Sequence, residues 1–259
     1  FDKPATTQYC YFINDLSPLS LHGNNSDDFT NLSNHPYSVA ATFSFDAYSI
    51  VLKAPYLRES FVRKGVSVSS IIANTLPNTF ILAITAMFIA MVLGISLGVF
   101  SAVHQHKFID QFLSSIAVFG MALPSFFSAI LIAWVFGFIY QEYTGLSMTG
   151  SLYEVDDYGS GESLVLKNLI LPAITLGIRP LAVVMQLTRN SILDTLGEDY
   201  IRTAKAKGLS SFRVLFVHAL PNALNPVVTS ASGWLASMLA GAVFVEFIFG
   251  WNGLGKEIV

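Results

Sequence analysis

The sequence predicts an all-α membrane protein, a polytopic bundle of transmembrane helices. Composition is the first reason, because 53% of the 259 residues are hydrophobic and only 12% are charged, about half the charged share of a soluble domain. The second reason is where charge is missing. Asp, Glu, Lys and Arg are all absent from residues 65–106, 111–141 and 214–245. About 20 apolar helical residues cross a hydrocarbon core about 30 Å thick, so each of these stretches is long enough to span a membrane.

The first 70 residues are expected to form a region of their own outside the membrane. They include a polar, turn-rich stretch at 22–36, HGNNSDDFTNLSNHP, which is typical of a loop. Cys10 is the only cysteine, so neither a disulfide within the chain nor a thiolate zinc cluster can form. The first ten residues lack the basic and apolar regions of a signal peptide, and residue 1 is not Met. We therefore expect the chain to be truncated rather than to start there.

We expect four spanning helices, at about 76–103, 111–140, 169–192 and 226–247. The third of these is the least uniform, because Arg179 and Gln186 interrupt it. A charge near the middle of a bilayer costs about 2.5–3.5 kcal/mol on insertion scales. Neighbouring helices or a water-filled cavity must therefore shelter Arg179.

Basic residues beside the spans predict how the bundle is oriented. The connection 104–110 carries Lys107, and five basic residues follow within or after the third span: Arg189, Arg202, Lys205, Lys207 and Arg213. Such residues favour the cytoplasmic side. The connection 141–167 carries five acidic residues against one lysine, which fits the outer side. Residues 1–70 should then lie outside as well.

Small residues and one proline give the spans further structure. Small residues recur every fourth position in two spans, at Gly94 and Gly98 and at Gly233, Ser237 and Gly241. They let helix backbones approach closely, and packing within the bundle is the more frequent reason for such spacing, with contact to a second subunit as the alternative. Pro124 lies inside the 111–140 span and should kink it.

A polar segment at 198–221 is predicted to form a helix–turn–helix elbow on the cytoplasmic side. Glu198 and Asp199 at its start, with Lys205 and Lys207 at the end of the first helix, complement the helix dipole. Gly208 is placed to cap the C-terminus of that helix. A second helix at 212–220 would be capped by Ser210 or Ser211 and ended by Pro221.

One face of the first elbow helix is expected to be open to another protein. Ile201, Ala204 and Gly208 share that face by helical spacing, and Arg202 and Lys205 lie opposite. Two explanations fit these residues equally well. The segment could be a surface helix that satisfies its own charges, or a docking helix for a cytoplasmic partner.

The elbow resembles the coupling segment of ABC-importer permeases, known as the EAA motif. The start of that motif falls on Arg202-Thr203-Ala204, its glycine on Gly208, and its end on His218-Ala219-Leu220-Pro221. Arg202, Thr203 and His218 depart from the general pattern. The run EDYIRTAKAKGL at 198–209 is similar to the version in B-type permeases of the dipeptide/oligopeptide/nickel family. The likeness extends to FDKP at 1–4, Gln8-Tyr9, TLPNTFIL at 75–82, LTRNSILDTLGEDY at 187–200 and FIFGWNGLG at 247–255.

This resemblance implies a type I ABC importer permease in the bacterial inner membrane. Residues 1–70 would be an extracytoplasmic loop region between a missing first helix and the next span, and residues 71–259 the permease core. The chain would form a heterodimer with a C-type permease subunit and a translocation pathway for di- or oligopeptides. The alternative cargo is nickel or another small solute.

The resemblance also implies which partners and residues couple transport to ATP. Two cytoplasmic ATPase subunits would bind ATP and Mg, an extracytoplasmic binding protein would deliver the solute, and this chain would hold no cofactor and not be an enzyme. The sequence agrees in lacking G-x-x-x-x-G-K-[ST]. The implied ATPase-coupling residues are Glu198, Asp199, Tyr200, Ile201, Arg202, Thr203, Ala204, Lys205, Ala206, Lys207, Gly208, Leu209, Leu220 and Pro221.

Three polar residues within the spans are candidates for the translocation pathway: Arg179, Gln186 and Glu246. The Arg179 guanidinium could meet a peptide carboxylate. The alternative is a structural ion pair with Glu246 or a bond to a carbonyl.

Other functional classes find less support. The spans contain no paired carboxylates, Ser–His pair or metal set at recognisable spacing, which disfavours an intramembrane enzyme. A net charge of −3 without a compact basic cluster disfavours nucleic-acid binding. A non-ABC channel or structural membrane protein stays as the different-class alternative, and it would not require the elbow.

Overall fold

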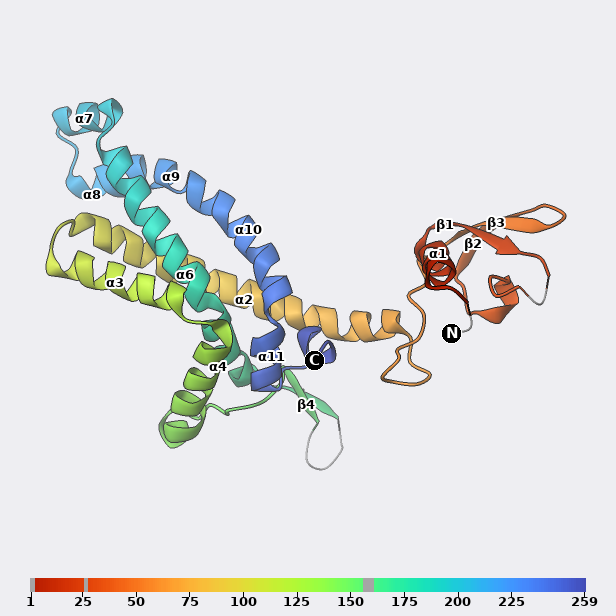
Figure 1. Ribbon diagram of the computed structural model, residues 1–259. Helices are drawn as coiled ribbons and strands as arrows, with labels where there is room; N and C mark the ends of the chain where they lie inside the picture. The colour runs from red at the N-terminus through yellow and green to blue at the C-terminus, as the bar shows by residue number, and fades with distance from the viewer. Residues whose placement is uncertain (1–2, 26–27, 156–160) are drawn as a thin grey trace. The chain divides into compact units, whose positions relative to one another are not determined.

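The computed structural model describes residues 3–25, 28–155 and 161–259 (Figure 1). The chain divides into two compact units, Phe1–Asn74 and Thr75–Val259. The second unit is built largely as the sequence predicts, whereas the first unit differs from the prediction. The predicted mostly helical membrane fold is confirmed.

The first unit is a folded body built on a three-stranded antiparallel sheet, where the sequence suggested a loop region. Its strands are β1 (Leu19–Gly23), β2 (Val39–Ser44) and β3 (Tyr48–Lys53), arranged in the order β1–β3–β2. Helix α1 (Ala5–Leu16) and the 3-10 turn η1 (Leu32–Asn34) complete it. Alternate residues of β3 are buried, as expected of a strand with one covered face.

Polar side chains, rather than a large apolar core, hold much of this unit together. The buried Asp15 carboxylate accepts hydrogen bonds from the Tyr37 hydroxyl at 2.7 Å and from Arg58 Nε at 2.8 Å. Lys53 Nζ donates to the Asp15 backbone carbonyl. His22 is also buried, and its two ring nitrogens lie 2.8 Å from Ser20 Oγ and 2.6 Å from the Thr30 carbonyl oxygen.

The second unit is a helix bundle. Its longer helices are α2 (Val68–Val103, which begins in the first unit), α3 (Phe108–Ala122), α4 (Ser125–Trp134), α6 (Lys167–Leu196), α10 (Asn225–Gly241) and α11 (Val243–Phe249). A π-helical turn, η2 (Val135–Ile139), continues α4 and is followed by α5 (Gln141–Thr144) and a hairpin of β4 (Tyr153–Val155) and β5 (Glu162–Leu164). A 3-10 turn, η4 (Gly255–Glu257), lies close to the C-terminus.

Two of these helices, α2 and α6, are each long and apolar enough to cross a membrane. Within the described residues the total rises to four if each bent pair is counted as one span: α3 with α4–η2, and α10 with α11. All four lie where the sequence predicts spans.

The break at Pro124 is much sharper than the kink that the sequence suggested. The helix axes on either side meet at 108°. Leu123, which precedes the proline, has an extended backbone, as steric contact with a proline ring favours. Pro124 is therefore the residue before α4 rather than a residue inside a continuous helix.

Helices α2 and α6 cross in close backbone contact at the two glycines of α2. A Cβ added to Gly94 would lie 2.7 Å from Val184 Cγ1, and one added to Gly98 would lie 2.6 Å from the Met185 carbonyl oxygen. A Cβ added to Gly233 or Gly241 of α10 would have no neighbour within 4 Å in the described part of the chain. The first set of small residues thus packs within the bundle, and the second faces open space.

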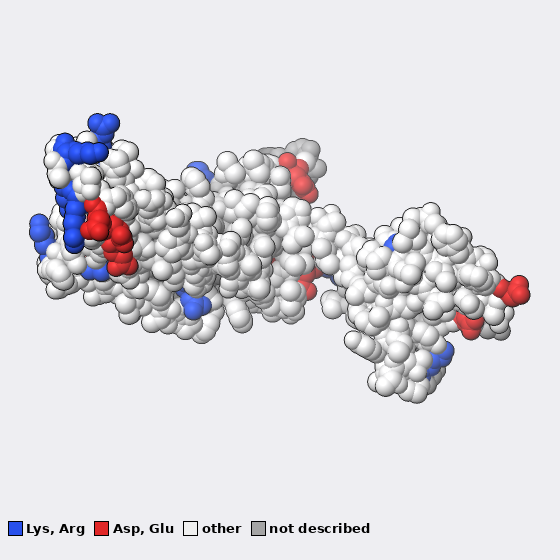
Figure 2. All heavy atoms as spheres, turned by 90° about the horizontal axis from the view of Figure 1, so that it is seen from above, with Lys and Arg blue, Asp and Glu red and all other residues white. Residues whose placement is uncertain are grey.

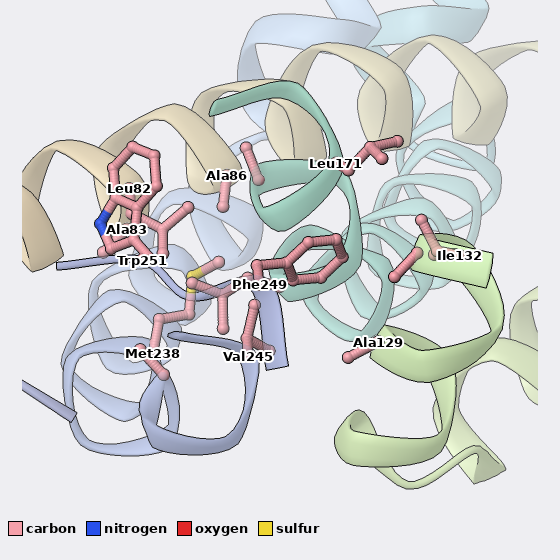
Figure 3. Close-up of a cluster of buried hydrophobic side chains, with 14 of the residues drawn as sticks. Leu82, Ala83, Ala86, Ala129, Ile132, Leu171, Met238, Val245, Phe249 and Trp251 are labelled. Atoms are coloured by element: carbon pink, nitrogen blue, oxygen red, sulfur yellow. The ribbon is translucent and has the colours of Figure 1, made fainter. Parts of the chain in front are cut away.

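The largest apolar cluster joins five helices at the end of the bundle where α4 and α11 meet (Figure 3). Phe249 and Trp251 are its largest fully buried members. Trp251 Nε1 donates to the Asn78 carbonyl oxygen at 3.1 Å, and Asn78 Nδ2 donates to the Asn252 carbonyl oxygen at 2.8 Å. The segment after α11 is thereby fastened to α2.

Candidate functional site

The predicted elbow lies at the opposite end of the bundle, beside the turn between α2 and α3 (Figure 1). It comprises α7 (Asp199–Ala206), α8 (Ser211–Arg213), the π-helical turn η3 (Val214–Ala219) and α9 (Leu220–Ala223). Figure 2 shows Lys and Arg side chains gathered over this end, with acidic side chains among them. The elbow joins α6 to α10, so any force on it acts on both helices.

The predicted caps of the elbow are present. Gly208 has a φ of +78°, and its N–H donates to the Lys205 carbonyl at 2.9 Å. The N–H of Leu209 donates to the Ala204 carbonyl at 3.4 Å, which completes the double hydrogen bond of a Schellman motif. Ser210, not Ser211, is the N-cap of the second helix, and its hydroxyl accepts from the Arg213 N–H at 3.4 Å.

The prediction that Ile201 and Ala204 face a partner is wrong. Ile201 is 0% exposed and Ala204 is 7% exposed. Both pack against Val214 and Ala219 of the second elbow helix. Helical spacing shows correctly that Ile201 and Ala204 share a face, but the chain folds back and covers that face itself.

The other side of α7 is the one available to a partner. Its exposed residues are Asp199, Tyr200, Arg202, Thr203, Lys205 and Ala206, and Gly208 beyond the helix is also exposed. Arg202 forms an ion pair with Asp199 at 3.2 Å, with both side chains largely in solvent, where such pairs contribute little to stability. The exposed face of α7 is therefore free to exchange these contacts for others.

The prediction that Pro221 ends the second elbow helix is wrong. The ribbon continues from α8 through η3 into α9, with Pro221 in the first turn of α9. A proline lacks the N–H that an α-helical turn would use, and the first turn of a helix does not need it. The wider π-helical turn before Pro221 separates the two α-helical registers, so the helix can continue.

Sequence reasoning missed an ion pair between the buried Asp110 and the half-buried Arg189, which ties the elbow end of α6 to the turn between α2 and α3. Asp110 Oδ1 accepts from Arg189 Nε at 2.6 Å and from Ser101 Oγ at 2.5 Å. Asp110 Oδ2 accepts from Arg189 Nη2 at 2.7 Å and from the His106 N–H at 3.0 Å. We call this group the Asp110 clamp. Its only sequence signal is a pair of opposite charges next to two different spans.

Arg179 lines a small cavity between α6 and α10. The cavity has a volume of about 100 Å³, and its lining includes Ser125, Thr175, Trp234 and Ser237. Arg179 is exposed, and within the described part of the chain it has no hydrogen bond or ion pair. The structural alternative of a pair with Glu246 is therefore not formed.

The other two predicted pathway residues lie in different surroundings. Gln186 is half-buried on the same face of α6 as Arg179, two turns further along. Glu246 is 0% exposed, and its Oε2 accepts from the Gly255 N–H at 2.6 Å. The structure thus brings Arg179 and Gln186 onto one face and keeps Glu246 apart, where it holds the segment after α11.

Sequence comparison places this architecture in a known family. Residues 94–259 match the family described as binding-protein-dependent transport system inner membrane component. The dipeptide transport system permease protein DppB of Haemophilus influenzae is 42% identical over 196 residues, which is 71% of this chain and 59% of that protein. The oligopeptide transport system permease protein AppB of Bacillus subtilis is 37% identical over 202 residues, 77% of this chain and 62% of that protein.

A third relative agrees with these two. The dipeptide transport system permease protein DppB of Escherichia coli K12 is 37% identical over 198 residues, 70% of this chain and 58% of that protein. The chain thus spans 58–62% of the length of these three relatives. The predicted resemblance to B-type peptide permeases is confirmed.

Comparison of structures supports the same fold. The crystal structure of an amino acid ABC transporter with histidines aligns with a TM-score of 0.53 and 16% sequence identity, covering 73% of this chain and 76% of that one. Because the identity is low, this match speaks for the fold alone. The structural match supports the fold of an ABC transporter permease. The family match over residues 94–259 shows that the chain belongs to the family of binding-protein-dependent transport system inner membrane components.

Proposed function

We propose that this chain is the transmembrane permease subunit of a bacterial ABC importer for di- or oligopeptides. The elbow at 198–221 is the single observation that carries this proposal. Its caps and its own buried cluster fix its shape, and one face of α7 stays exposed at the end of the bundle. A preformed helix with a free face is what a cytoplasmic partner needs in order to push on the bundle.

In this proposal the exposed face of α7 docks on an ATPase subunit at the cytoplasmic surface of the inner membrane. Two such subunits would bind ATP and Mg, and a C-type permease would complete the membrane part. Closure of the ATPase pair would displace the elbow, and with it α6 and α10. Nucleotide binding elsewhere would thereby shift the bundle between inward- and outward-facing states.

An extracytoplasmic binding protein would deliver the solute. Peptide is the preferred cargo because the relatives carry the names of dipeptide and oligopeptide systems. Nickel or another small solute is the less supported alternative. A non-ABC channel or structural membrane protein would have no use for a shaped and partly exposed elbow.

The test is copurification and uptake with the complete transporter. The variant Ala206→Trp adds a large side chain at an exposed position of α7, so it should leave membrane insertion intact while it blocks docking. We expect loss of the ATPase subunits on purification and loss of ATP-driven uptake of a labelled dipeptide in proteoliposomes. A control is Glu142→Trp, an exposed substitution on α5 near the other end, which should retain both properties. Normal uptake by Ala206→Trp would count against the proposal.

A further inference from the structure

Arg179 stands out as a charge inside an apolar helix with no partner of its own. It lies well within α6, which is one of the two helices able to span a membrane alone. The described residues offer its guanidinium no ion pair. Ionisable residues within spans usually pair with one another or face a water-filled cavity, and they mark the paths of ions and substrates. Arg179 faces a cavity, so a partner from outside the chain is the remaining candidate.

The wall opposite Arg179 is an open face of α10. Thr229, Gly233, Ser237 and Gly241 follow one another at four-residue steps. A second hollow of about 360 Å³ lies on this face and is lined by Thr229, Ser230, Gly233, Trp234 and Ser237. Trp234 and Ser237 also line the cavity of Arg179. The two hollows therefore adjoin, and small side chains, hydroxyl groups and one indole line the larger one.

Room and charge together indicate what could occupy this space. Gly233 and Gly241 have no side chains, and no atom of the described chain outside the backbone of α10 lies within 4 Å of the position that a Cβ would take at either residue. An extended peptide could therefore lie along α10. A guanidinium presents a planar fork of donors that matches a carboxylate in two hydrogen bonds. We propose that Arg179 binds the C-terminal carboxylate of a peptide in transit, while the open face of α10 accommodates the residues before it. This inference rests on the proposed function, because it concerns the path of the same solute.

This arrangement would read a feature common to all peptides. Every unmodified peptide ends in a carboxylate, whereas its side chains differ, and the hollow on α10 presents four small residues beside one indole. A site that holds its ligand through one charged contact, without other groups that enclose the ligand, can also release it. The same guanidinium would repel a bare cation such as Ni²⁺, so the site favours peptide over nickel.

The first experiment compares Arg179→Gln, Arg179→Lys and Lys167→Gln in the complete complex with its binding protein in proteoliposomes. Lys167 is an exposed cation at the start of the same helix and serves as the matched control. With saturating loaded binding protein, we expect Arg179→Gln to take up labelled dipeptide about ten- to a hundredfold more slowly, the range expected for loss of a charge-assisted hydrogen bond. Arg179→Lys should retain part of the uptake, and Lys167→Gln should be unchanged.

A second readout locates the peptide itself. A dipeptide with a diazirine-bearing leucine at its C-terminus is irradiated during turnover, and its adducts are mapped by mass spectrometry. We expect adducts at Trp234 or Ser237 in the wild type and their loss in Arg179→Gln. Equal uptake and unchanged adducts in Arg179→Gln would overturn the inference and leave the proposed function standing. Loss of the second permease subunit from purified Arg179→Gln would assign Arg179 to that interface and also overturn it. Absence of peptide uptake by the wild type would overturn the proposed function itself.

Discussion

Ala204 and Ala206 are two residues apart on α7 and have opposite surroundings. Ala204 is buried in the small cluster inside the elbow, whereas Ala206 faces solvent. A carboxylate at 204 would be buried without a partner, at a cost of several kcal/mol or a forced opening of the elbow. Ala204→Asp should therefore expose the 197–213 segment to limited proteolysis, and Ala206→Asp should not. Equal cleavage of the two variants would show that the elbow is not packed as described.

His22 gives the first unit a pH dependence. Burial lowers the pKa of its imidazole from the ordinary value of about 6.5. Below about pH 6.5 the unfolded chain therefore binds a proton that the folded unit does not, which favours unfolding. Stability should be constant above that pH and fall as the pH drops toward the lowered pKa of the folded state.

Amide hydrogen exchange of β1 and β3, corrected for the intrinsic effect of pH, measures this change. We expect weaker protection at pH 5.5 than at pH 7.5. The variant His22→Gln keeps a side chain that can bond to Ser20 and Thr30 but does not titrate, so it should show less of this slope. A slope equal to that of the wild type would assign the effect to another group.

At the scale of elements, the Asp110 clamp should contribute more to thermal stability than an ion pair on the surface does. Asp110→Asn removes the negative charge and replaces one of the two oxygens that accept from Arg189 with an amide donor, and hydrogen bonds to charged groups contribute about 1.5–3 kcal/mol. We expect a clear fall in the melting temperature of the complete complex. The control is Asp199→Asn, which removes an exposed pair with Arg202 and should leave the melting temperature unchanged.

A double-mutant cycle then separates the pair from the individual side chains. Arg189→Gln and Asp110→Asn together should cost less than the sum of the two single changes, because the first change has already broken the contact. Strict additivity would show that Asp110 and Arg189 act independently.

The sequence predicted individual elements where local chemistry decides them. The caps at Gly208 and Ser210 follow from glycine's tolerance of positive φ and from the serine hydroxyl. The sequence could not predict what covers a helix face. Helical periodicity places Ile201 and Ala204 on one face, but it does not show which residues pack against that face. Nor could it foresee the Asp110–Arg189 contact, which joins residues 79 positions apart. The size of the turn at Pro124 depends on packing against the rest of the bundle.

At the scale of the whole molecule, the small residues of α2 and those of α10 can be compared directly, because the first pack inside the bundle and the second lie on an open face. Gly98→Leu would force a side chain into the Met185 carbonyl and the Thr188 side chain, so it should lower the yield of folded protein. At Gly233 the Cβ of a leucine would meet no atom of the described chain within 4 Å apart from the helix's own backbone, so we expect the subunit to fold normally. We expect Gly233→Leu to reduce peptide uptake or binding of the second permease. Folding yields in the reverse order would contradict this division.

The two compact units meet between Asn74 and Thr75, and the sequence signal nearest to this boundary is the loss of charge after Lys64. The sheet of the first unit was hidden, since its buried positions include Ser49 and Lys53 and therefore lack a hydrophobic alternation. Arg179 was recognisable as a candidate from sequence because charge is conspicuous in an apolar span. The open wall of α10 beside it required the three-dimensional arrangement.

The crossing of α2 and α6 has a mechanical consequence. The contact of Gly98 with Met185 and Thr188 falls between Arg179 and the end of α6 at Leu196. At about 1.5 Å per residue, Met185 lies about 9 Å from Arg179 and about 16 Å from Leu196 along the helix. A second close contact, between Gly177 of α6 and the Ala86 carbonyl of α2, holds α6 two residues before Arg179. Because α6 is held against α2 on both sides of Arg179, a sideways shift of the elbow would reach Arg179 as a movement of the two helices together, like that of a single strut.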